Sequence, residues 1–464
     1  MTCIPSLAVR PRRTPFISAI ALACLLSSAS SWAQSSADVM QELKQLRLEL
    51  QQLRAEMDAI KQSRTADQAV PAALSSSSQV ATSSPTADTP ASPARPMSQE
   101  TTGAPVAVAD ANESRVSLFG YGEMLYTRPW NDASQAMATA RRGVLGFAYR
   151  FNDRTRFAAE LEVENAVVSA SDQGEVAFEQ LYVEHDIHDQ LTAKAGLFLL
   201  PIGYMNETHE PTRYYGVTRN LVETAIIPTT WREMGVGLQG NTGEGWRWNA
   251  GLVTSFDLTK WSKADATDTK ASPLGAIHQE GQLAKAASWA YYGALNYDGV
   301  PGVNVGGSWY SGGIGQQQAS IPTPNASVTL AELHAKWQVG RWDLSTLAAQ
   351  GNFQGVAAFN AAGVSGTNPV PDEFRGWYTQ AAYRLWRQGD YSLVPFARYE
   401  NVNTAVGFSG LPQGLMPQTD PDTRVVTVGA SFYLHPQVVL KVDTQRYLNN
   451  SSLDRLNVGV GFHY

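Results

Sequence analysis

Hydrophobic and polar residues alternate along the chain from about residue 115 to its end, in short segments separated by turn residues. In residues 138–151, Leu145, Phe147, Tyr149 and Phe151 share one face. The last segment, residues 455–464, places apolar side chains at even positions and mostly polar or glycine residues at odd ones. This period of two is typical of β-strands whose two faces meet different surroundings.

Short and long connections between these segments alternate, and counting both predicts about sixteen strands. Tight turns are expected at residues 152–153, 187–189, 241–243, 298–299, 339–340, 388–390 and 435–436, and long connections at 256–288, 312–326, 352–373 and 402–422. Tight turns on one rim and long loops on the other are typical of an all-β transmembrane antiparallel β-barrel. A soluble β-sandwich array or propeller is the alternative, but aromatic residues at strand ends favour the barrel.

The N-terminal residues 1–33 have the order of a secretory signal peptide. Arg10, Arg12 and Arg13 precede an apolar run at 16–26, and small residues lead to Ala33. Cleavage before Cys24, as in a lipoprotein, is a weaker alternative because the apolar run continues past this cysteine. No later apolar run is long enough for a membrane-spanning helix, so only a closed barrel would satisfy every backbone group inside a membrane.

Residues 34–62 are predicted to form a periplasmic coiled coil, because apolar residues recur at alternating steps of four and three. This seam consists of Val39, Leu43, Leu46, Leu50, Leu53, Met57 and Ile60. Residues 63–114 are rich in Ser, Thr, Ala and Pro and are predicted to be a disordered linker. The barrel domain is expected at 115–464.

Cysteine content and charge exclude several classes of function. Cys3 and Cys24 both lie in the predicted signal, so the mature chain can form neither a disulfide nor a thiolate metal site. Loss of the three signal arginines changes the formal net charge from −7 to −10. An acidic chain without a basic tract gives no support to nucleic-acid binding.

One long connection, at about 201–231, is expected to fold into the barrel and narrow it. It separates a strand at 191–199 from another at 234–239, and it contains Pro201, Pro211 and Pro228 without any sustained period. A connection of this length needs a functional or topological reason.

Four stretches in this region resemble the proteobacterial porins grouped with the phosphate-selective porins O and P. They are FAAELEVENA (157–166), GEVAFEQLYVEHDI (174–187), KAGLFLLPIGYMNETHEP (194–211) and VETAIIPTTWREMGVGLQG (222–240). The resemblance implies a trimeric sixteen-stranded outer-membrane channel whose third long loop forms the constriction. The phosphate substrate is not carried over, because the loop has no lysine and the expected wall has about as many acids as bases.

The acids of the strand at 157–164 are candidate pore-lining residues. If its apolar residues face lipid, Glu160, Glu162 and Glu164 face the lumen on successive pleats. Such carboxylates attract cations, raise one another's pKa or pair with arginines. A divalent-metal site with His209 and Glu210 is an alternative, although a solvated acidic wall explains the same residues more simply.

The charges of the inserted loop and of the opposite wall are the other candidates. They are Glu207, His209, Glu210, Arg213, Arg219 and Glu223 in the loop, and Arg142, Arg150, Lys194, Arg398 and Lys441 with the parity to face inward. They could create a transverse field across the constriction, or the loop charges could pair locally and hold the loop's fold; both can be true.

The pattern therefore predicts passive diffusion of small hydrophilic solutes or ions through a trimer. A structural or adhesive barrel that uses the coiled coil as a spacer to the cell wall is the alternative. An enzyme is not expected, since the seven histidines are scattered outside any nucleophile motif, and no cofactor is expected. Expected partners are outer-membrane lipid, other copies of the chain, and the barrel-assembly machinery through the strand ending at Tyr464. The expected location is a Gram-negative outer membrane, with the N-terminal segment in the periplasm.

Overall fold

The computed structural model describes residues 115–166, 174–417 and 422–464. The predicted signal peptide (1–33), coiled coil (34–62) and linker (63–114) lie outside these residues. Within the described part, no helix has both the length and the apolar character needed to cross a membrane.

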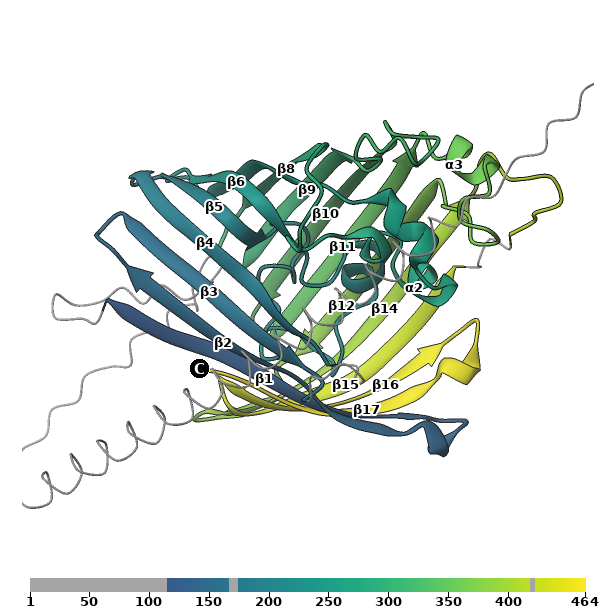
Figure 1. Ribbon diagram of the computed structural model, residues 1–464. Helices are drawn as coiled ribbons and strands as arrows, with labels where there is room; N and C mark the ends of the chain where they lie inside the picture. Colours follow the sequence, from purple (N-terminus) through teal and green to yellow (C-terminus); the bar gives the residue numbers. More distant parts are fainter. Residues whose placement is uncertain (1–114, 167–173, 418–421) are drawn as a thin grey trace, which may run out of the picture. The chain divides into compact units, whose positions relative to one another are not determined.

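The described residues form one antiparallel sheet that closes on itself, because β1 pairs with β2 on one side and with β17 on the other (Figure 1). The strands are β1 (Val116–Pro129), β2 (Met137–Arg150), β3 (Thr155–Glu164), β4 (Val176–His188), β5 (Leu191–Leu199), β6 (Arg232–Asn241), β7 (Trp246–Thr254), β8 (Trp289–Tyr297), β9 (Val303–Gly313), β10 (Ser327–Val339), β11 (Trp342–Gln354), β12 (Glu373–Tyr383), β13 (Trp386–Gln388), β14 (Tyr391–Gly407), β15 (Thr423–His435), β16 (Val438–Tyr447) and β17 (Arg455–His463).

The barrel has sixteen strands around its circumference when β12 and β13 are counted as one, which confirms the predicted number. β12 and β13 both pair with β14, so they are two segments of one barrel strand that is interrupted at residues 384–385. β5 is the fifth strand, and the connection that follows it is the third long one, as the alternation of connections predicts. Both ends of the barrel sequence meet at the short-turn rim, where Gly120 and Tyr464 exchange backbone hydrogen bonds of 3.1 and 2.9 Å.

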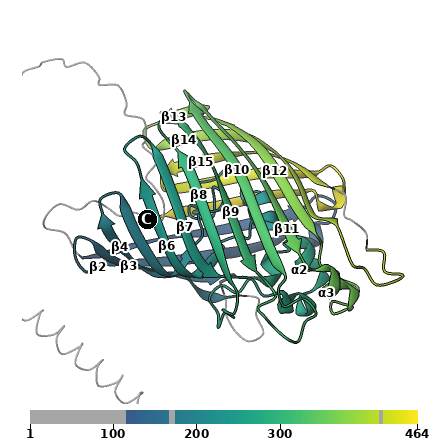
Figure 2. The same cartoon turned by 90° about the horizontal axis from the view of Figure 1, so that it is seen from above.

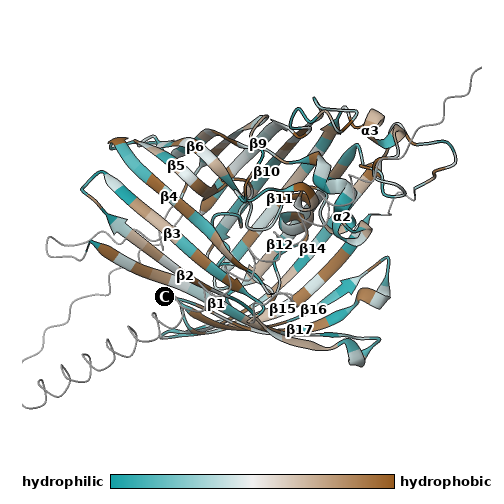
Figure 3. Ribbon diagram, viewed as in Figure 1, coloured by the Kyte–Doolittle hydropathy of each residue, from teal (hydrophilic) through white to brown (hydrophobic). Residues whose placement is uncertain are grey.

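Hydrophobic and hydrophilic residues alternate along most strands (Figure 3), and many of the apolar side chains on the outward face are exposed. Leu145 on β2, Val236 on β6 and Leu333 on β10 are among its exposed side chains. Two outward glycines of β1, Gly120 and Gly122, leave room that the rings of Tyr464 and Phe462 occupy. Alternating apolar-out residues over a closed barrel match the surface of a membrane barrel.

Tryptophan is unevenly distributed over this outward face. Trp246 on β7, Trp289 on β8, Trp309 on β9, Trp337 on β10, Trp342 on β11, Trp377 on β12 and Trp386 on β13 are exposed. Among the described strands, β1–β6 and β14–β17 carry no tryptophan. One continuous arc of the barrel therefore holds all of its strand tryptophans.

The hydrophobic core lies inside the barrel, where long loops pack against the inward faces of β7–β12. Loop 3 (200–231) contributes Ile202, Val222 and Ile226; loop 4 (255–288) contributes Leu258, Trp261 and Leu274; loop 5 (314–326) contributes Ile314 and Ile321; loop 6 (355–372) contributes Val356, Phe359 and Val370. The side of the lumen bounded by these strands is thus filled. The remaining inward wall, on β14–β17 and β1–β4, is largely polar.

Short helical turns organise these loops. They are η2 (Val222–Ile226) in loop 3, η3 (Leu258–Lys263), α2 (Ala266–Ala271) and η4 (Gly275–Ile277) in loop 4, and α3 (Ala357–Ala361) in loop 6. Two further turns, η1 (Ala133–Gln135) and η5 (Ser451–Leu453), lie in the connections after β1 and β16. Figures 1 and 2 place α2 and α3 at the long-loop end of the barrel. Asn368 joins loop 6 to loop 4 by accepting from Trp261 Nε1 through its carbonyl at 2.8 Å.

Candidate functional site at loop 3

Loop 3 crosses the lumen and is attached to several parts of the wall. Its Leu221 N–H donates to Glu400 on β14 at 2.5 Å, and its Val217 N–H donates to Asp443 on β16 at 2.6 Å. The Thr212 hydroxyl lies 2.6 Å from His463 Nδ1 on β17. The prediction that this loop folds inward therefore agrees with its contacts.

Glu223 is the main organising residue of loop 3. One carboxylate oxygen accepts the backbone N–H groups of Tyr204 and Met205 at 2.6 and 2.7 Å. The other accepts Asn220 Nδ2 at 2.8 Å and the Tyr378 hydroxyl of β12 at 3.2 Å. Burial raises the pKa of Glu223 despite these donors. This carboxylate holds the loop together, as the local-pairing interpretation expected, and it does not face open water.

Two of the three candidate acids of β3 are buried on the inward side of the barrel. Glu160 and Glu162 have exposed fractions of 8% and 5%, while Glu164 is half-buried at the long-loop end of the strand. Their outward neighbour Leu161 is exposed. The parity argument places these side chains inside, but two of them are buried and do not form the fully solvated acidic wall that was expected.

A fourth acid, Glu179 on β4, joins this cluster and was missed by sequence reasoning. The register between β3 and β4 shifts where Glu160 pairs with Gln180 and Leu161 pairs with Phe178. Glu179 is the extra residue of this β-bulge, and both Glu179 and Gln180 are buried inside. A strict period of two assigns one of them to the outside, and a bulge breaks that period by one residue.

His209 of loop 3 joins this acidic wall to β1. Its Nε2 lies 2.6 Å from Glu179 Oε1 and 2.7 Å from the Tyr121 hydroxyl, and its Nδ1 lies 3.0 Å from the carbonyl oxygen of Asn206. A carbonyl and a carboxylate, both acceptors, therefore face the two ring nitrogens. His209 thereby ties loop 3 to both β1 and β4.

Arg142 on β2 neutralises two buried acids beside this cluster. Its Nε lies 2.8 Å from Glu123 on β1, and its Nη1 lies 3.4 Å from Glu162. The hydroxyl of Tyr214, from loop 3, donates to the other oxygen of Glu123 at 2.8 Å. Burying charges is costly unless they are paired in this way.

Arg219 of loop 3 is buried with a different set of partners. Its Nη1 donates to the hydroxyls of Thr229 and Thr230, both within the same loop. Burial and the nearby Arg142 guanidinium together lower the pKa of Arg219. These hydrogen bonds thus hold the loop's own fold.

The other predicted basic residues, on the wall and in loop 3, differ in their burial. Arg398 on β14 is buried and donates through Nε to Glu400 at 2.9 Å. Lys441 on β16 is buried with its Nζ 3.7 Å from the centre of the Tyr214 ring, a cation–π geometry. Arg150, by contrast, is exposed at the short-turn end of β2, and Arg213 of loop 3 is exposed as well. Arg398 and Lys441 are therefore buried on strands that also carry the buried acids Glu400 and Asp443.

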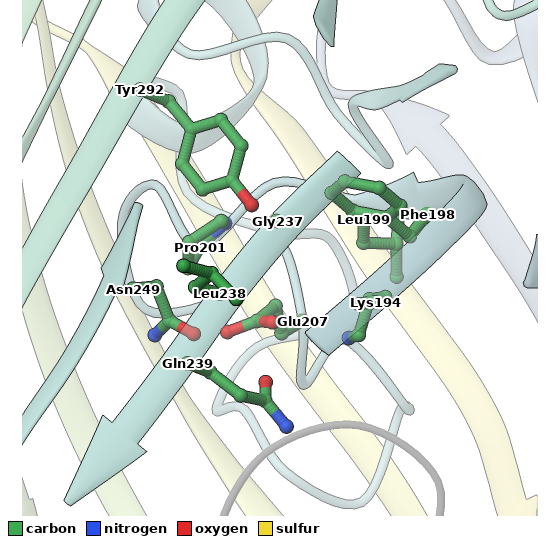
Figure 4. Close-up of a pocket in the computed structure, with 10 residues that line it drawn as sticks. All are labelled: Lys194, Phe198, Leu199, Pro201, Glu207, Gly237, Leu238, Gln239, Asn249 and Tyr292. Atoms are coloured by element: carbon green, nitrogen blue, oxygen red, sulfur yellow. The ribbon is translucent and has the colours of Figure 1, made fainter. Parts of the chain in front are cut away.

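Lys194 and Glu207 lie in a narrow crevice between loop 3 and β5–β8 (Figure 4). Lys194 Nζ is 3.2 Å from Glu184 on β4, and burial raises the pKa of Glu207. The crevice has a volume of about 10 Å³, which is room for about one water molecule. It is too small to hold a solute.

Further ion pairs line the wall nearer the short-turn rim. Arg156 on β3 lies 2.7 Å from both Glu184 and Asp186, and Arg247 on β7 lies 2.5 Å from Asp298. On β10, Lys336 Nζ is 3.6 Å from Asp343, while His334 is held by Glu332 at 2.8 Å and lies under the Tyr204 ring. In the sequence, the available signal for these residues was their place in the alternation, which points their side chains into the barrel.

The metal-site alternative for Glu160, Glu162, His209 and Glu210 gains no support. In residues 115–166, 174–417 and 422–464, no group of three or more His, Cys, Asp or Glu side chains is arranged to hold a metal ion. The acids near His209 are instead engaged by that histidine and by Arg142.

An uncharacterized protein of Aquifex aeolicus (strain VF5) is 30% identical to the chain over 342 residues, which are 71% of this chain and 75% of that protein. The chain belongs to the same family as that protein. No protein-family profile matches it.

The solved structures that resemble the chain are porins. Salmonella typhi OmpF, in a complex with daunomycin, has a TM-score of 0.51 at 13% identity, covering 75% of this chain and 97% of OmpF. An anion-selective porin from Comamonas acidovorans has a TM-score of 0.45 at 12% identity, covering 76% of this chain and 99% of that porin. The likeness to OmpF shows the fold: this family member is a closed sixteen-stranded barrel of the porin type.

Proposed function

We propose that this chain is an outer-membrane porin through which small hydrophilic solutes and ions diffuse passively. The observation that carries the proposal is a closed barrel, apolar outside, whose polar inner wall is crossed by loop 3. A barrel that served only as a structural or adhesive anchor would not need an inward loop fixed to so many strands. The phosphate selectivity of the porins that the sequence resembles is not part of the proposal.

We further propose that the channel favours cations. Glu160, Glu162 and Glu179 lie together on the β3–β4 wall, where Arg142 contacts Glu162 and His209 contacts Glu179, and the half-buried Glu164 follows at the long-loop end. A unit charge about 10 Å from a permeating ion contributes on the order of 1 kcal/mol at an effective dielectric constant of roughly 30, which is about a fivefold change in local ion concentration.

Planar-bilayer recording of the purified mature chain tests both statements. Under a salt gradient we expect open channels whose reversal potential indicates cation preference, and a Glu160→Gln/Glu162→Gln/Glu164→Gln variant should lower the cation-to-anion permeability ratio about fivefold. Arg150→Gln is the control, since this exposed residue lies away from loop 3. Anion preference that ignores the triple change would refute the cation proposal, and a complete lack of channels would favour the structural alternative.

We propose that three copies associate through the side of the barrel whose strands carry no tryptophan, where Trp130, in the connection that follows β1, is exposed near the long-loop end. Lipid-facing surfaces of membrane barrels carry aromatic girdles, and here the strand tryptophans lie on β7–β13. The arc that runs through β17, β1 and β2 is then available for contact between subunits. The coiled coil predicted at 34–62 would lie in the periplasm and support the same trimer.

Cross-linking through introduced cysteines checks this arrangement. Leu145→Cys on β2 should give covalent dimers and trimers with a short bis-maleimide, whereas Leu333→Cys on β10 should stay monomeric on a denaturing gel. Both side chains are exposed on the outward face, so they are matched for reactivity. Stronger cross-linking at Leu333 than at Leu145 would move the interface to the tryptophan-bearing arc.

A further inference from the structure

The last part of loop 4 folds over the outside of the barrel at its long-loop end. Glu280 of this loop lies 3.3 Å from the guanidinium of Arg232, the first residue of β6. Gly281 is so close to the neighbouring strands that an added Cβ would lie 2.9 Å from Leu197 Cδ1 on β5 and 3.0 Å from Met234 Cγ on β6. Residues 280–281 therefore rest on these two strands.

The alternation along β5 and β6 places the strand residues of this contact on the outward face. Glu233 points into the barrel, where it accepts a hydrogen bond of 3.3 Å from the core residue Trp231. Its neighbours Arg232 and Met234 therefore point outward, as does Leu197, which pairs directly with Met234. Arg232 and Leu197 are nevertheless buried. Loop 4 lies over both of them.

The contact between Glu280 and Arg232 has an electrostatic consequence. A cation on the lipid-facing side of a membrane barrel is unfavourable unless it is paired or reaches water. Glu280 pairs with Arg232, and His278 Nδ1 lies 3.4 Å from the same carboxylate oxygen of Glu280. Loop 4 thus supplies the counter-charge for an arginine on the outward face.

The same segment carries an apolar side chain at its tip. Gln279 closes the tip as a short loop, because its amide binds both the N–H and the carbonyl oxygen of Lys285 at 2.8 and 3.0 Å. Leu283 lies between these two residues with a left-handed φ of +48° and an exposed fraction of 99%. Bulky residues rarely adopt this conformation, and an apolar side chain gains free energy when it leaves water.

The tip lies near the level of an outward tryptophan. The Met234 N–H donates to the Thr254 hydroxyl at 3.3 Å, and Thr254 pairs with Trp289 at the start of β8. Trp289 is exposed on the outward face. Tryptophans in this position on membrane barrels lie at the interface between lipid and water. The tip is therefore placed at the long-loop edge of the apolar band.

We propose that residues 280–284 form a lipid contact, in which Leu283 enters the acyl-chain region at the edge of the bilayer while Glu280 shields Arg232. A second copy of the chain is the competing occupant. Loop 4 starts on β7 and ends on β8, within the tryptophan-bearing arc, and β3 and β4 separate β5 from the proposed subunit contact at β17, β1 and β2. This position favours lipid. The inference rests on the membrane location proposed above and not on solute diffusion.

Fluorescence quenching tests the contact in the full mature chain, because both cysteines lie in the predicted signal. Leu283→Cys is labelled with NBD and reconstituted into phosphatidylcholine vesicles that contain a nitroxide lipid. Val236→Cys, on the outward face of β6, is the lipid control, and Met416→Cys, in the connection after β14, is the water control; these two side chains are 55% and 91% exposed. Nitroxide quenching at Leu283 should be within about twofold of that at Val236. Iodide in the water should quench it less than at Met416.

Each other outcome overturns a defined statement. Iodide quenching as strong as at Met416 would place the tip in water, and protection from both quenchers would place a second copy of the chain over it. Either result would overturn the lipid contact. If nitroxide lipid fails to quench the label at Val236 as well, the proposed membrane location itself is wrong.

Glu280→Gln, added to the labelled Leu283→Cys chain, tests the role of the ion pair. Without its counter-charge the tip should detach from Arg232, so iodide quenching should rise about two- to fivefold, the effect of one partly exposed ion pair. Gln282→Ala is the matched control at an exposed position of the same tip, and it should leave both signals unchanged. If Glu280→Gln also changes neither signal, the ion pair does not hold the tip and the inference fails.

Discussion

Glu223→Ala should release loop 3 from the wall and leave the barrel closed. The substitution removes one acceptor from four donors, namely two backbone N–H groups, the Asn220 amide and the Tyr378 hydroxyl. Each buried donor left without an acceptor costs about 1–3 kcal/mol, so the attached state of the loop should lose on the order of 3 kcal/mol or more. We expect larger, noisier single-channel currents and new trypsin cleavage after Arg219, which is 7% exposed in the intact loop.

Two companion variants show whether the carboxylate itself is responsible. Glu223→Gln keeps one oxygen for the Tyr204 and Met205 N–H groups and should give an intermediate result. Thr224→Ala, at the next position, removes a hydroxyl that donates only to the carbonyl oxygens of Asn220 and Leu221, so it should behave nearly as the wild type. If Glu223→Ala conducts like the wild type and resists trypsin after Arg219, the carboxylate is not what holds the loop.

Arg142→Met should lower the free energy of unfolding by about 3–5 kcal/mol, the usual effect of removing one partner from a buried ion pair. The methionine fills a similar volume, but Glu123 and Glu162 lose their shared cation, and both are buried inside the barrel. Denaturant unfolding followed by tryptophan fluorescence measures the change. Arg150→Met is the matched control, since it alters the same strand at an exposed position, and it should change stability by less than about 0.5 kcal/mol.

A neutralised variant separates lost charge from lost packing. Adding Glu123→Gln and Glu162→Gln to Arg142→Met removes the unpaired carboxylates, and most of the lost stability should return. If the triple variant is as unstable as Arg142→Met alone, packing of the arginine stem explains the effect and the ion pairs do not.

Alternation along single strands was enough to predict the barrel, its number of strands and the inward direction of Glu160 and Glu162. It succeeded because every strand lies between two different environments. Once one residue is assigned to a face, the period of two assigns all the others. It missed Glu179 because a bulge shifts the period within β4. Turn signals also ordered the connections correctly, which placed loop 3 after the fifth strand.

The alternation could not predict which side chains interact with one another inside the barrel. Parity gives a direction but no distance, so it could not show that Glu223 binds backbone N–H groups or that Arg142 lies between Glu123 and Glu162. The long loops have no period at all, and their core with β7–β12 depends on contacts between residues far apart in the chain. Consequently the sequence predicted one loop folded into the barrel, whereas four loops pack together against the inner wall in the structure.

The shared core of loops 3–6 links the long-loop end of the barrel to loop 3 inside it. Surface loops usually change sequence freely, because little depends on their packing. Here Trp261 and Phe359 are anchored in the same cluster as Ile226 of loop 3, so altering the outer loops also alters the support of the constriction. If the chain is the channel proposed above, a molecule that binds loop 4 or loop 6 would therefore also change permeation past loop 3, and a mutation in either loop that prevents such binding would carry a cost in permeation.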